Sequence, residues 1–286
     1  MTDLRPFLEA LAPEACLSTM ARGLVPSPIL EISYEVRARI AAGASVVQFT
    51  VGDFDPAHFR VPAALEGFLH EAVDAHATNY PPADGERSLR ESIRDHYRAH
   101  LGLDYPIDGV LVSSGARPAL YGAYRCLLDP GEVVVSPVPG WNNGNFAQLV
   151  GARHVAVPTR PEDDFLPTAE ALRPHLSEAR LLVLCSPVNP TGTMFEATAL
   201  RDISRLVLEE NRRRERVGAR RLYLVYDQVY RLLAFGDRPH LTPVGLEPRW
   251  PATRSSSTPS ARASPPPGSG WAGWSGRPTS SSACAP

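Results

Sequence analysis

The sequence predicts an α/β fold, with a mostly parallel sheet and helices on both faces. Two patterns lead to this prediction. From about residue 110 onward, short apolar runs alternate with amphipathic stretches, which is the spacing of strands joined by crossover helices. Several apolar runs are continuous rather than alternating, which is typical of parallel strands covered on both faces.

The expected elements follow one another in a regular order. Helices are expected at residues 27–42, 61–75, 89–100, 118–128, 145–150, 167–176 and 197–211. Strands are expected at residues 46–51, 110–113, 132–136, 154–157, 181–185 and 222–227.

The composition changes abruptly after Glu247. Residues 251–286 contain no Val, Ile, Leu, Met, Phe or Tyr and are rich in Ser, Pro, Gly, Ala and Arg. Such a segment buries too little apolar surface to offset its ordering entropy, so we expect disorder. A natural Pro/Ser linker would have the same composition. We expect three parts: an N-terminal arm and helix at 1–45, a large α/β domain at 46–247, and this tail at 248–286.

Bulk composition argues against several classes of protein. The 286 residues are 43% hydrophobic and 21% charged with a net charge of −2, so we expect no nucleic-acid or membrane partner. No apolar stretch approaches the roughly 18–20 residues that span a bilayer. The four cysteines lack metal-ligand spacing, so we expect no metal site. Without an apolar signal core at the N-terminus, the expected location is cytoplasmic.

A strand-to-helix junction at residues 112–119 has the features of a phosphate site. Gly115 permits close approach of the backbone to a ligand, and Pro118 suits the first helical turn. Unpaired N–H groups and the helix dipole favour an anion there. The same kind of junction also occurs as a purely structural feature.

Three further segments follow the ends of expected strands. Trp141 lies just beyond one strand, where an aromatic ring can stack on a flat ring or simply pack. Cys-Ser-Pro-Val-Asn-Pro-Thr-Gly at 185–192 follows a second, which places Asn189 where open α/β sheets bind ligands. Asp227 ends a third and can pair with a protonated ring nitrogen, while Tyr230 can donate to a phenolic oxygen.

Together these segments resemble the class I and II pyridoxal-phosphate (PLP)-dependent aminotransferases of the aspartate aminotransferase fold, over residues 25–247. Residues 50–56 resemble the family's Gly-x-Pro-x-Phe segment, and residues 79–90 its Tyr-x-Pro-x-x-Gly…Leu-Arg stretch. The resemblance implies the PLP-dependent transferase fold, with 46–247 as the PLP-binding large domain and an incomplete C-terminal small domain. It also implies a homodimer that acts on an amino acid and a 2-oxo acid in amino acid metabolism.

The resemblance implies contacts to substrate and cofactor phosphate. Gly52 would bind the substrate carboxylate through its backbone. Tyr80 would reach the cofactor phosphate of the partner subunit. Gly115, Ala116 and Arg117 would hold the phosphate, the last two through backbone N–H groups. The family often has lysine or threonine at the position of Arg117.

It also implies contacts to the cofactor ring. Trp141 would stack on the ring, although its loop is about one residue longer than is usual in the family. Asn189 and Tyr230 would bond the phenolic oxygen of the ring. Asp227 would pair with the ring nitrogen.

The family's catalytic lysine is absent, because all 29 residues in the Lys+Arg count are arginine. The family's enzymes hold PLP as a Schiff base on a lysine that follows the Asp-x-x-Tyr segment. We therefore expect no catalytic residue in the chain as written, and an inactive product.

A shift of reading frame restores the missing motif. When the third base of each codon is joined to the first two of the next, 260–274 permits Ser-Lys-Gly-Phe-Ala-Ala-Thr-Gly-Leu-Arg-Val-Gly-Trp-Val-Val. The lysine codon would straddle Ala261 and Arg262. The same shift turns 254–258 into codons compatible with Val or Leu, then Asp. We interpret this as a frameshift near Pro248, natural or introduced in sequencing.

Three functional interpretations stay open. The first is an aminotransferase, with a PLP-dependent lyase or decarboxylating relative as its variant. The second is a non-catalytic PLP-binding pseudoenzyme. The third is a nucleic-acid binder, suggested by the arginine-rich residues 212–221, which we interpret instead as a solvated surface between a helix and a strand.

Overall fold

The computed structural model describes residues 16–52, 55–247, 256–258 and 272–275. The chain divides into two compact units, with the boundary after Tyr80. The domain boundary expected at residues 45–46 stays a prediction. Among the described residues, no helix combines the length and apolar character needed to cross a membrane.

The regular elements described in the first unit are all helices. The unit contains α3 (Thr19–Arg22), α4 (Pro28–Ala41) and α5 (Ala63–Asp74). The prediction of a strand at 46–51 is wrong, because no strand forms there. A strand requires a hydrogen-bonded neighbour. The described part of this unit provides none, and the side chains of Val47 and Phe49 are exposed.

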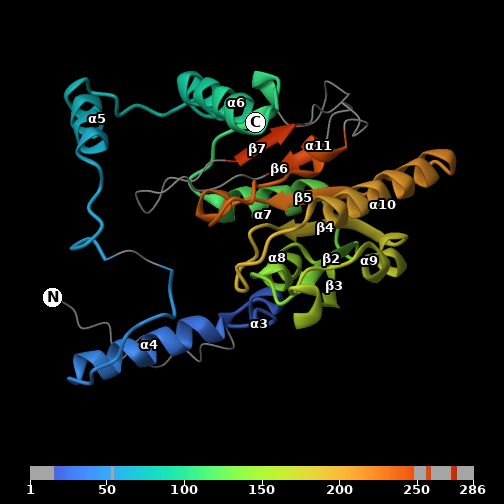
Figure 1. Cartoon of the computed structure of the whole chain (residues 1–286), viewed down its shortest axis with the longest axis horizontal. Coiled ribbons are helices and arrows are strands. Elements are labelled where there is room, and N and C mark those ends of the chain that lie inside the picture. Colours follow the sequence, from blue (N-terminus) through green and yellow to red (C-terminus); the bar gives the residue numbers. More distant parts are fainter. Residues whose placement is uncertain (1–15, 53–54, 248–255, 259–271, 276–286) are drawn as a thin grey trace. The chain divides into compact units, whose positions relative to one another are not determined.

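The second unit alternates strands and helices (Figure 1). Its helices are α6 (Arg87–Leu101), α7 (Ala116–Leu127), α8 (Asn143–Val150), α9 (Ala169–Leu176), α10 (Ala197–Arg216) and α11 (Pro243–Leu246). Its strands are β1 (Val110–Leu111), β2 (Val133–Val138), β3 (Arg153–Pro158), β4 (Ala179–Cys185), β5 (Tyr223–Asp227), β6 (Ser256–Thr258) and β7 (Ala272–Ser275). Short 3-10 turns lie at Ile107–Gly109, Pro161–Asp163 and Arg231–Leu233.

The predicted parallel sheet is confirmed. Four strands pair in the order β3-β2-β4-β5, and every pairing among them is parallel. A second sheet has the antiparallel order β1-β7-β6, and β6 lies beside β5 (Figure 1). The expectation of disorder after residue 247 is not tested for most of that segment, which lies outside the described residues.

Helices cover both faces of the parallel sheet, as the sequence predicts. On one face, Leu182 and Leu224 belong to a buried cluster completed by α9 and α10. On the other face, Val134 and Val183 pack in a cluster with α7 and α8. Alternate residues of a strand point to opposite faces, so β2 and β4 contribute to both clusters. This explains why their sequences are continuous apolar runs.

Helix α10 is longer than predicted and contains residues 212–216 of the arginine-rich segment. The helix ends at Arg216 rather than near Asn211, because ion pairs one turn apart sustain it. Both Arg213 and Arg214 contact Glu210, at 2.7 and 2.6 Å. The interpretation of this run as lying between helix and strand is therefore wrong for residues 212–216, whereas Arg220 and Arg221 do lie between α10 and β5.

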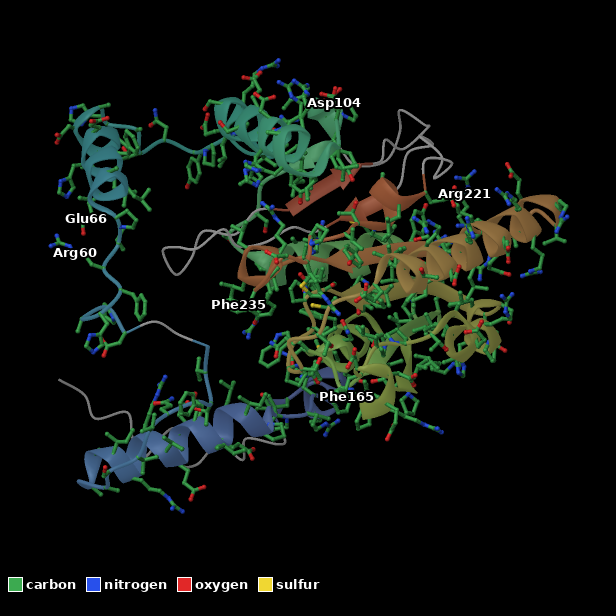
Figure 2. All side chains as sticks on the ribbon, in the orientation of Figure 1. Arg60, Glu66, Asp104, Phe165, Arg221 and Phe235 are labelled. Atoms are coloured by element: carbon green, nitrogen blue, oxygen red, sulfur yellow. The ribbon has the colours of Figure 1, made fainter. Side chains whose placement is uncertain are left out.

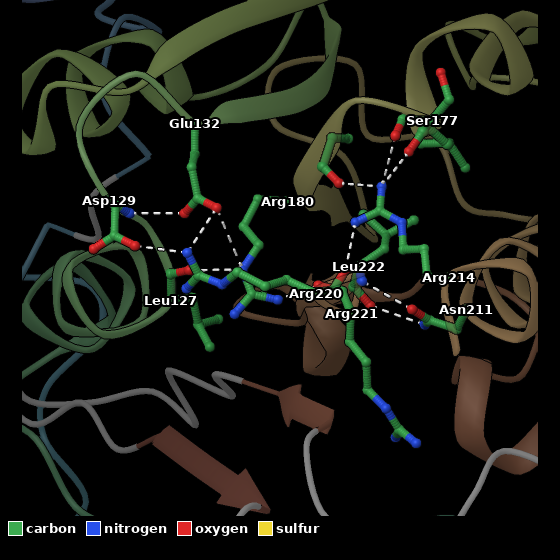
Figure 3. A network of polar contacts seen from close by, with 12 residues as sticks. Leu127, Asp129, Glu132, Ser177, Arg180, Asn211, Arg214, Arg220, Arg221 and Leu222 are labelled. Carbon is green, nitrogen blue, oxygen red and sulfur yellow. Dashed lines mark hydrogen bonds and ion pairs between the residues drawn. The ribbon is translucent and has the colours of Figure 1, made fainter. Parts of the chain in front are cut away.

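Buried arginines bond backbone carbonyl oxygens near the amino ends of β4 and β5 (Figure 3). The guanidinium of Arg214 donates to the carbonyl oxygens of Leu176, Ser177 and Ala179, at 2.6, 3.2 and 2.6 Å. Arg180 donates to the carbonyl oxygen of Leu127 at 3.1 Å. These bonds satisfy backbone groups at the edge opposite the strand ends that the sequence marks as functional.

We expect Arg214→Met to lower the free energy of unfolding by roughly 2–4 kcal/mol, because several buried carbonyl oxygens lose their donor. The control is Arg213→Met on the same helix, since Arg213 is exposed and contacts Glu210 alone among the described residues. It should change stability little. Urea denaturation of both variants checks this, and equal effects would contradict the assigned role of Arg214.

Candidate functional site

The parallel pairing of β4 and β5 brings two of the predicted segments together. In the register of these strands, Cys185 lies opposite Asp227. The amide of Ser186 then donates to the carbonyl oxygen of Asp227 at 3.0 Å. The loop at residues 186–192 therefore begins beside the end of β5, as the sequence predicts for the carboxyl edge of an open sheet.

Asn189 and Tyr230 meet across this edge. The side-chain amide of Asn189 donates to the phenolic oxygen of Tyr230 at 3.2 Å. Both side chains are partly buried. Two groups that the sequence places 41 residues apart thus converge on one point, where each can bond an oxygen of a ligand.

Asp227 carries its carboxylate at the end of β5. Burial raises the pKa of this carboxyl group to about 6, while the amide of Val229 opposes the shift by donating to Oδ1 at 3.0 Å. No salt bridge reaches Asp227 from the described residues. A cation placed beside it, such as a protonated ring nitrogen, would restore its ordinary acidity.

Tyr124 is a neighbour that the sequence did not single out. Its side chain is fully buried, and its hydroxyl donates to Oδ1 of Asn143 at 3.1 Å, which joins α7 to α8. Burial raises the pKa of Tyr124, and the nearby charge of Asp227 raises it further. The helical spacing of Tyr124 from Leu120 and Leu127 marks it only as a core residue.

The amino terminus of α7 has the geometry of an anion site. Gly115 precedes the helix with a backbone φ of 127°, which residues other than glycine rarely adopt. No side chain forms a capping hydrogen bond at the start of the helix. The first amides, those of Ala116 and Arg117, are therefore available to a phosphate. The sequence predicts this arrangement from the residue types alone.

Trp141 is held next to this helix terminus. The guanidinium of Arg117 lies 5.4 Å from the centre of the Trp141 ring. Gly140 permits the tight turn before it, because a Cβ there would lie 2.8 Å from the carbonyl oxygen of Pro137. The start of α7 and the ring of Trp141 are thus neighbours.

Gly52 and Tyr80 belong to the first unit, and the structure describes each unit only by itself. The side chain of Tyr80 is exposed within its unit. The structure therefore does not test the roles predicted for these two residues.

The described residues fit the non-covalent contacts of PLP. Asn189 and Tyr230 suit a ring oxygen, the carboxylate of Asp227 suits a ring nitrogen, and the start of α7 suits a phosphate. The covalent contact does not fit, because the whole sequence contains no lysine. The shifted-frame position at residues 261–262 lies outside the described residues. The described part of the chain holds no cluster of His, Cys, Asp or Glu suited to a metal ion.

Comparison with known proteins identifies the family. The family model "Aminotransferase class I and II" matches residues 44–251 of the chain. The chain belongs to this family. The match covers the α/β domain that the sequence predicts.

The curated relatives are aminotransferases. A bifunctional aspartate aminotransferase and glutamate/aspartate-prephenate aminotransferase of Petunia hybrida is 30% identical over 239 residues, which are 83% of this chain and 47% of the relative. An aspartate/prephenate aminotransferase of Thermus thermophilus is 27% identical, over 81% of this chain and 57% of the relative. The chain thus spans about half the length of the curated relatives it matches.

Solved structures agree on the fold. The aspartate aminotransferase of Rhizobium meliloti matches with a TM-score of 0.81 at 24% identity, over 91% of this chain and 63% of that chain. The N-succinyldiaminopimelate aminotransferase of Mycobacterium tuberculosis matches with a TM-score of 0.75 at 28% identity, over 91% and 64%. The predicted PLP-dependent transferase fold is confirmed.

We expect Asp227→Asn to stabilise the chain without cofactor at pH 7.5. The folded pKa of about 6 exceeds the ordinary value of 3.8, so wild-type stability is full below pH 4 and falls as the pH rises to 6. The variant should avoid this loss and gain roughly 1–3 kcal/mol at pH 7.5, but little at pH 3.5. Urea denaturation at both pH values checks this, with the exposed Asp237→Asn as control. A variant less stable than wild type at pH 7.5 would contradict the burial of this charge.

Proposed function

We propose that this chain is the cofactor-binding portion of a PLP-dependent aminotransferase, which transfers an amino group between an amino acid and a 2-oxo acid. The observation that supports it most is the half-buried carboxylate of Asp227, with its raised pKa, at the end of β5, where Asn189 and Tyr230 also meet. Family membership and the names of the relatives support the same reaction class.

Each described residue has a distinct task in this proposal. Asp227 keeps the cofactor's ring nitrogen protonated. When bound, PLP supplies an electron sink for the bonds of the substrate's α carbon. Asn189 and Tyr230 bond the ring oxygen and fix the rotation of the ring in its plane. Trp141 covers a ring face, and the amides of Ala116 and Arg117 hold the phosphate.

The remaining predicted roles are proposals on the resemblance alone. We assign Gly52 to the substrate carboxylate and Tyr80 to the cofactor phosphate of a partner subunit in a homodimer. We also retain a cytoplasmic location, and an N-terminal arm and helix at 1–45 before the large domain at 46–247.

The absence of lysine favours a second candidate for the chain as written, a non-catalytic PLP-binding pseudoenzyme. Without a lysine, no side chain has the amine that the family uses to attach the cofactor and to move a proton at the substrate's α carbon. A PLP-dependent lyase of the same fold would share the ring contacts and is the alternative chemistry.

The positions of two strands support the frameshift hypothesis. β6 (Ser256–Thr258) and β7 (Ala272–Ser275) lie between β5 and β1 in the second unit. Their residue types are unusual for strands inside a sheet. The shifted frame instead permits Val or Leu followed by Asp over the first segment, and Gly-Trp-Val-Val over the second.

Ion pairs weaken the observation that suggested nucleic-acid binding. Arg213 and Arg214 contact Glu210. Arg220 contacts Asp129 and Glu132 at 2.6 and 2.9 Å. These carboxylates offset the positive charge that a phosphate backbone would require.

We expect the chain to bind pyridoxamine 5′-phosphate (PMP) non-covalently. Asp227→Asn should weaken binding about tenfold or more, since it removes an ion pair with the ring nitrogen. Asp237→Asn should bind like wild type. Equilibrium dialysis measures the affinities, and equal affinities for the two variants would contradict the role of Asp227.

We expect borohydride treatment with PLP to leave no cofactor attached to any side chain of the chain as written, so that peptide mapping finds at most a label on the N-terminal amine. Sequencing of the coding DNA tests the cause: codons that forbid the shifted motif would remove the frameshift hypothesis. If the shifted frame is present, the frame-restored protein should retain PLP after borohydride treatment and show aminotransferase activity.

A further inference from the structure

The segment that follows the candidate site is poorly anchored. Residues 232–239 are largely exposed, and the side chain of Phe235 projects from the ribbon with 87% of its surface exposed (Figure 2). The ion pair between Arg238 and Glu196, at 2.9 Å, joins two exposed side chains and contributes little. The position of residues 232–239 must therefore be fixed by the contacts at the two ends of this segment.

A partly buried hydrogen bond joins those two ends. Gln228 is only 1% exposed, and its Oε1 accepts a bond from Nε2 of His240 at 2.6 Å. Next to it, the hydroxyl of Tyr226 donates to the carbonyl oxygen of Leu241 at 3.0 Å. The Tyr226 and His240 rings are 6.1 Å apart. Residues 240–241 are thus bonded to the end of β5 through two side chains.

The bond has no substitute nearby. Within the described chain, Nε2 of Gln228 and Nδ1 of His240 have no hydrogen-bond partner. Losing the remaining bond would leave a buried amide with neither water nor protein to satisfy it. Burial, aided by the charge of Arg231, lowers the pKa of His240 to about 4, so the ring is neutral at pH 7.

Gln228 belongs to the turn that carries the candidate cofactor contacts. The amide of Val229 bonds the carboxylate of Asp227, and the amide of Arg231 donates to the carbonyl oxygen of Gln228 at 3.0 Å. Tyr230 lies inside this turn. A rotation at Gln228 would therefore move both Asp227 and Tyr230.

We propose that Gln228 and His240 are positioning residues of this site: their bond fixes the turn at 227–231 so that Asp227 and Tyr230 address one bound ring. This inference rests on the proposed function and adds two residues to it. Neither is expected to touch the cofactor.

The test compares PMP affinity across a mutant cycle. Gln228→Met and His240→Phe keep the side-chain volume and remove the bond, and each should weaken PMP binding roughly five- to tenfold. Because the two residues act through one bond, the double variant should bind PMP about as tightly as the single variant with the lower affinity. His240→Gln retains a donor near the position of Nε2 and should bind within about twofold of wild type. Additive losses in the double variant would contradict the shared role.

A control separates positioning from general stability. Val207→Ala removes two methyl groups from the buried cluster between α10 and the sheet and should lower the melting temperature without changing PMP affinity. If this variant weakens PMP binding as much as Gln228→Met does, the positioning role is wrong.

Hydrogen exchange tests the inference independently of any cofactor. In Gln228→Met, the amides of Val229 and Arg231 should exchange faster, while the amide of Val225 within β5 should not. If the wild-type chain binds no PMP, the proposed function fails, and the exchange rates still decide the effect on the turn. Unchanged exchange at Val229 and Arg231 would overturn the inference.

Discussion

The parallel pairing of β4 with β5 is the constraint on which the candidate site depends. It ends the two strands side by side and places the loop that carries Asn189 next to Asp227. The apolar residues of both strands are covered on two faces, so a slip in register would cost buried contacts in both clusters. The geometry of the polar edge is therefore fixed by the packing of the sheet.

The Asp227 carboxylate at this edge has no cationic partner among the described residues. Burial raises the pKa of this carboxyl group to about 6. A cationic ligand would stabilise its ionised form more than it would stabilise an exposed carboxylate, because the surrounding protein screens the attraction between the two charges less than water does. The Asn189–Tyr230 pair and the uncapped start of α7 add sites for a ring oxygen and a phosphate. Under the proposed function, these groups together would favour a flat, phosphorylated ligand with a basic ring nitrogen.

The sequence predicts the large domain well, because continuous apolar runs such as 181–185 have few ways to be buried. Predictions from local sequence patterns were wrong where contacts with other residues decide whether a strand forms or where a helix ends. The segment 46–51 has the composition of a strand but no paired neighbour among the described residues. Helix α10 extends beyond its apolar residues because Arg213 and Arg214 form ion pairs with Glu210. Among the predicted site residues, Asn189 meets Tyr230 and Arg117 lies beside Trp141, whereas their roles stay predictions. Gln228 and His240 carry no motif and meet only through the fold.

The absent lysine separates two properties that the family combines, holding the cofactor and reacting with it. The direct test is the ring-nitrogen resonance of ¹⁵N-labelled PMP bound to this chain, at a pH where free PMP has lost its ring proton. The account predicts the shift of a protonated ring nitrogen in the wild-type complex and its loss in Asp227→Asn. An unprotonated ring nitrogen in the wild-type complex, or the same protonated shift in both, would contradict it.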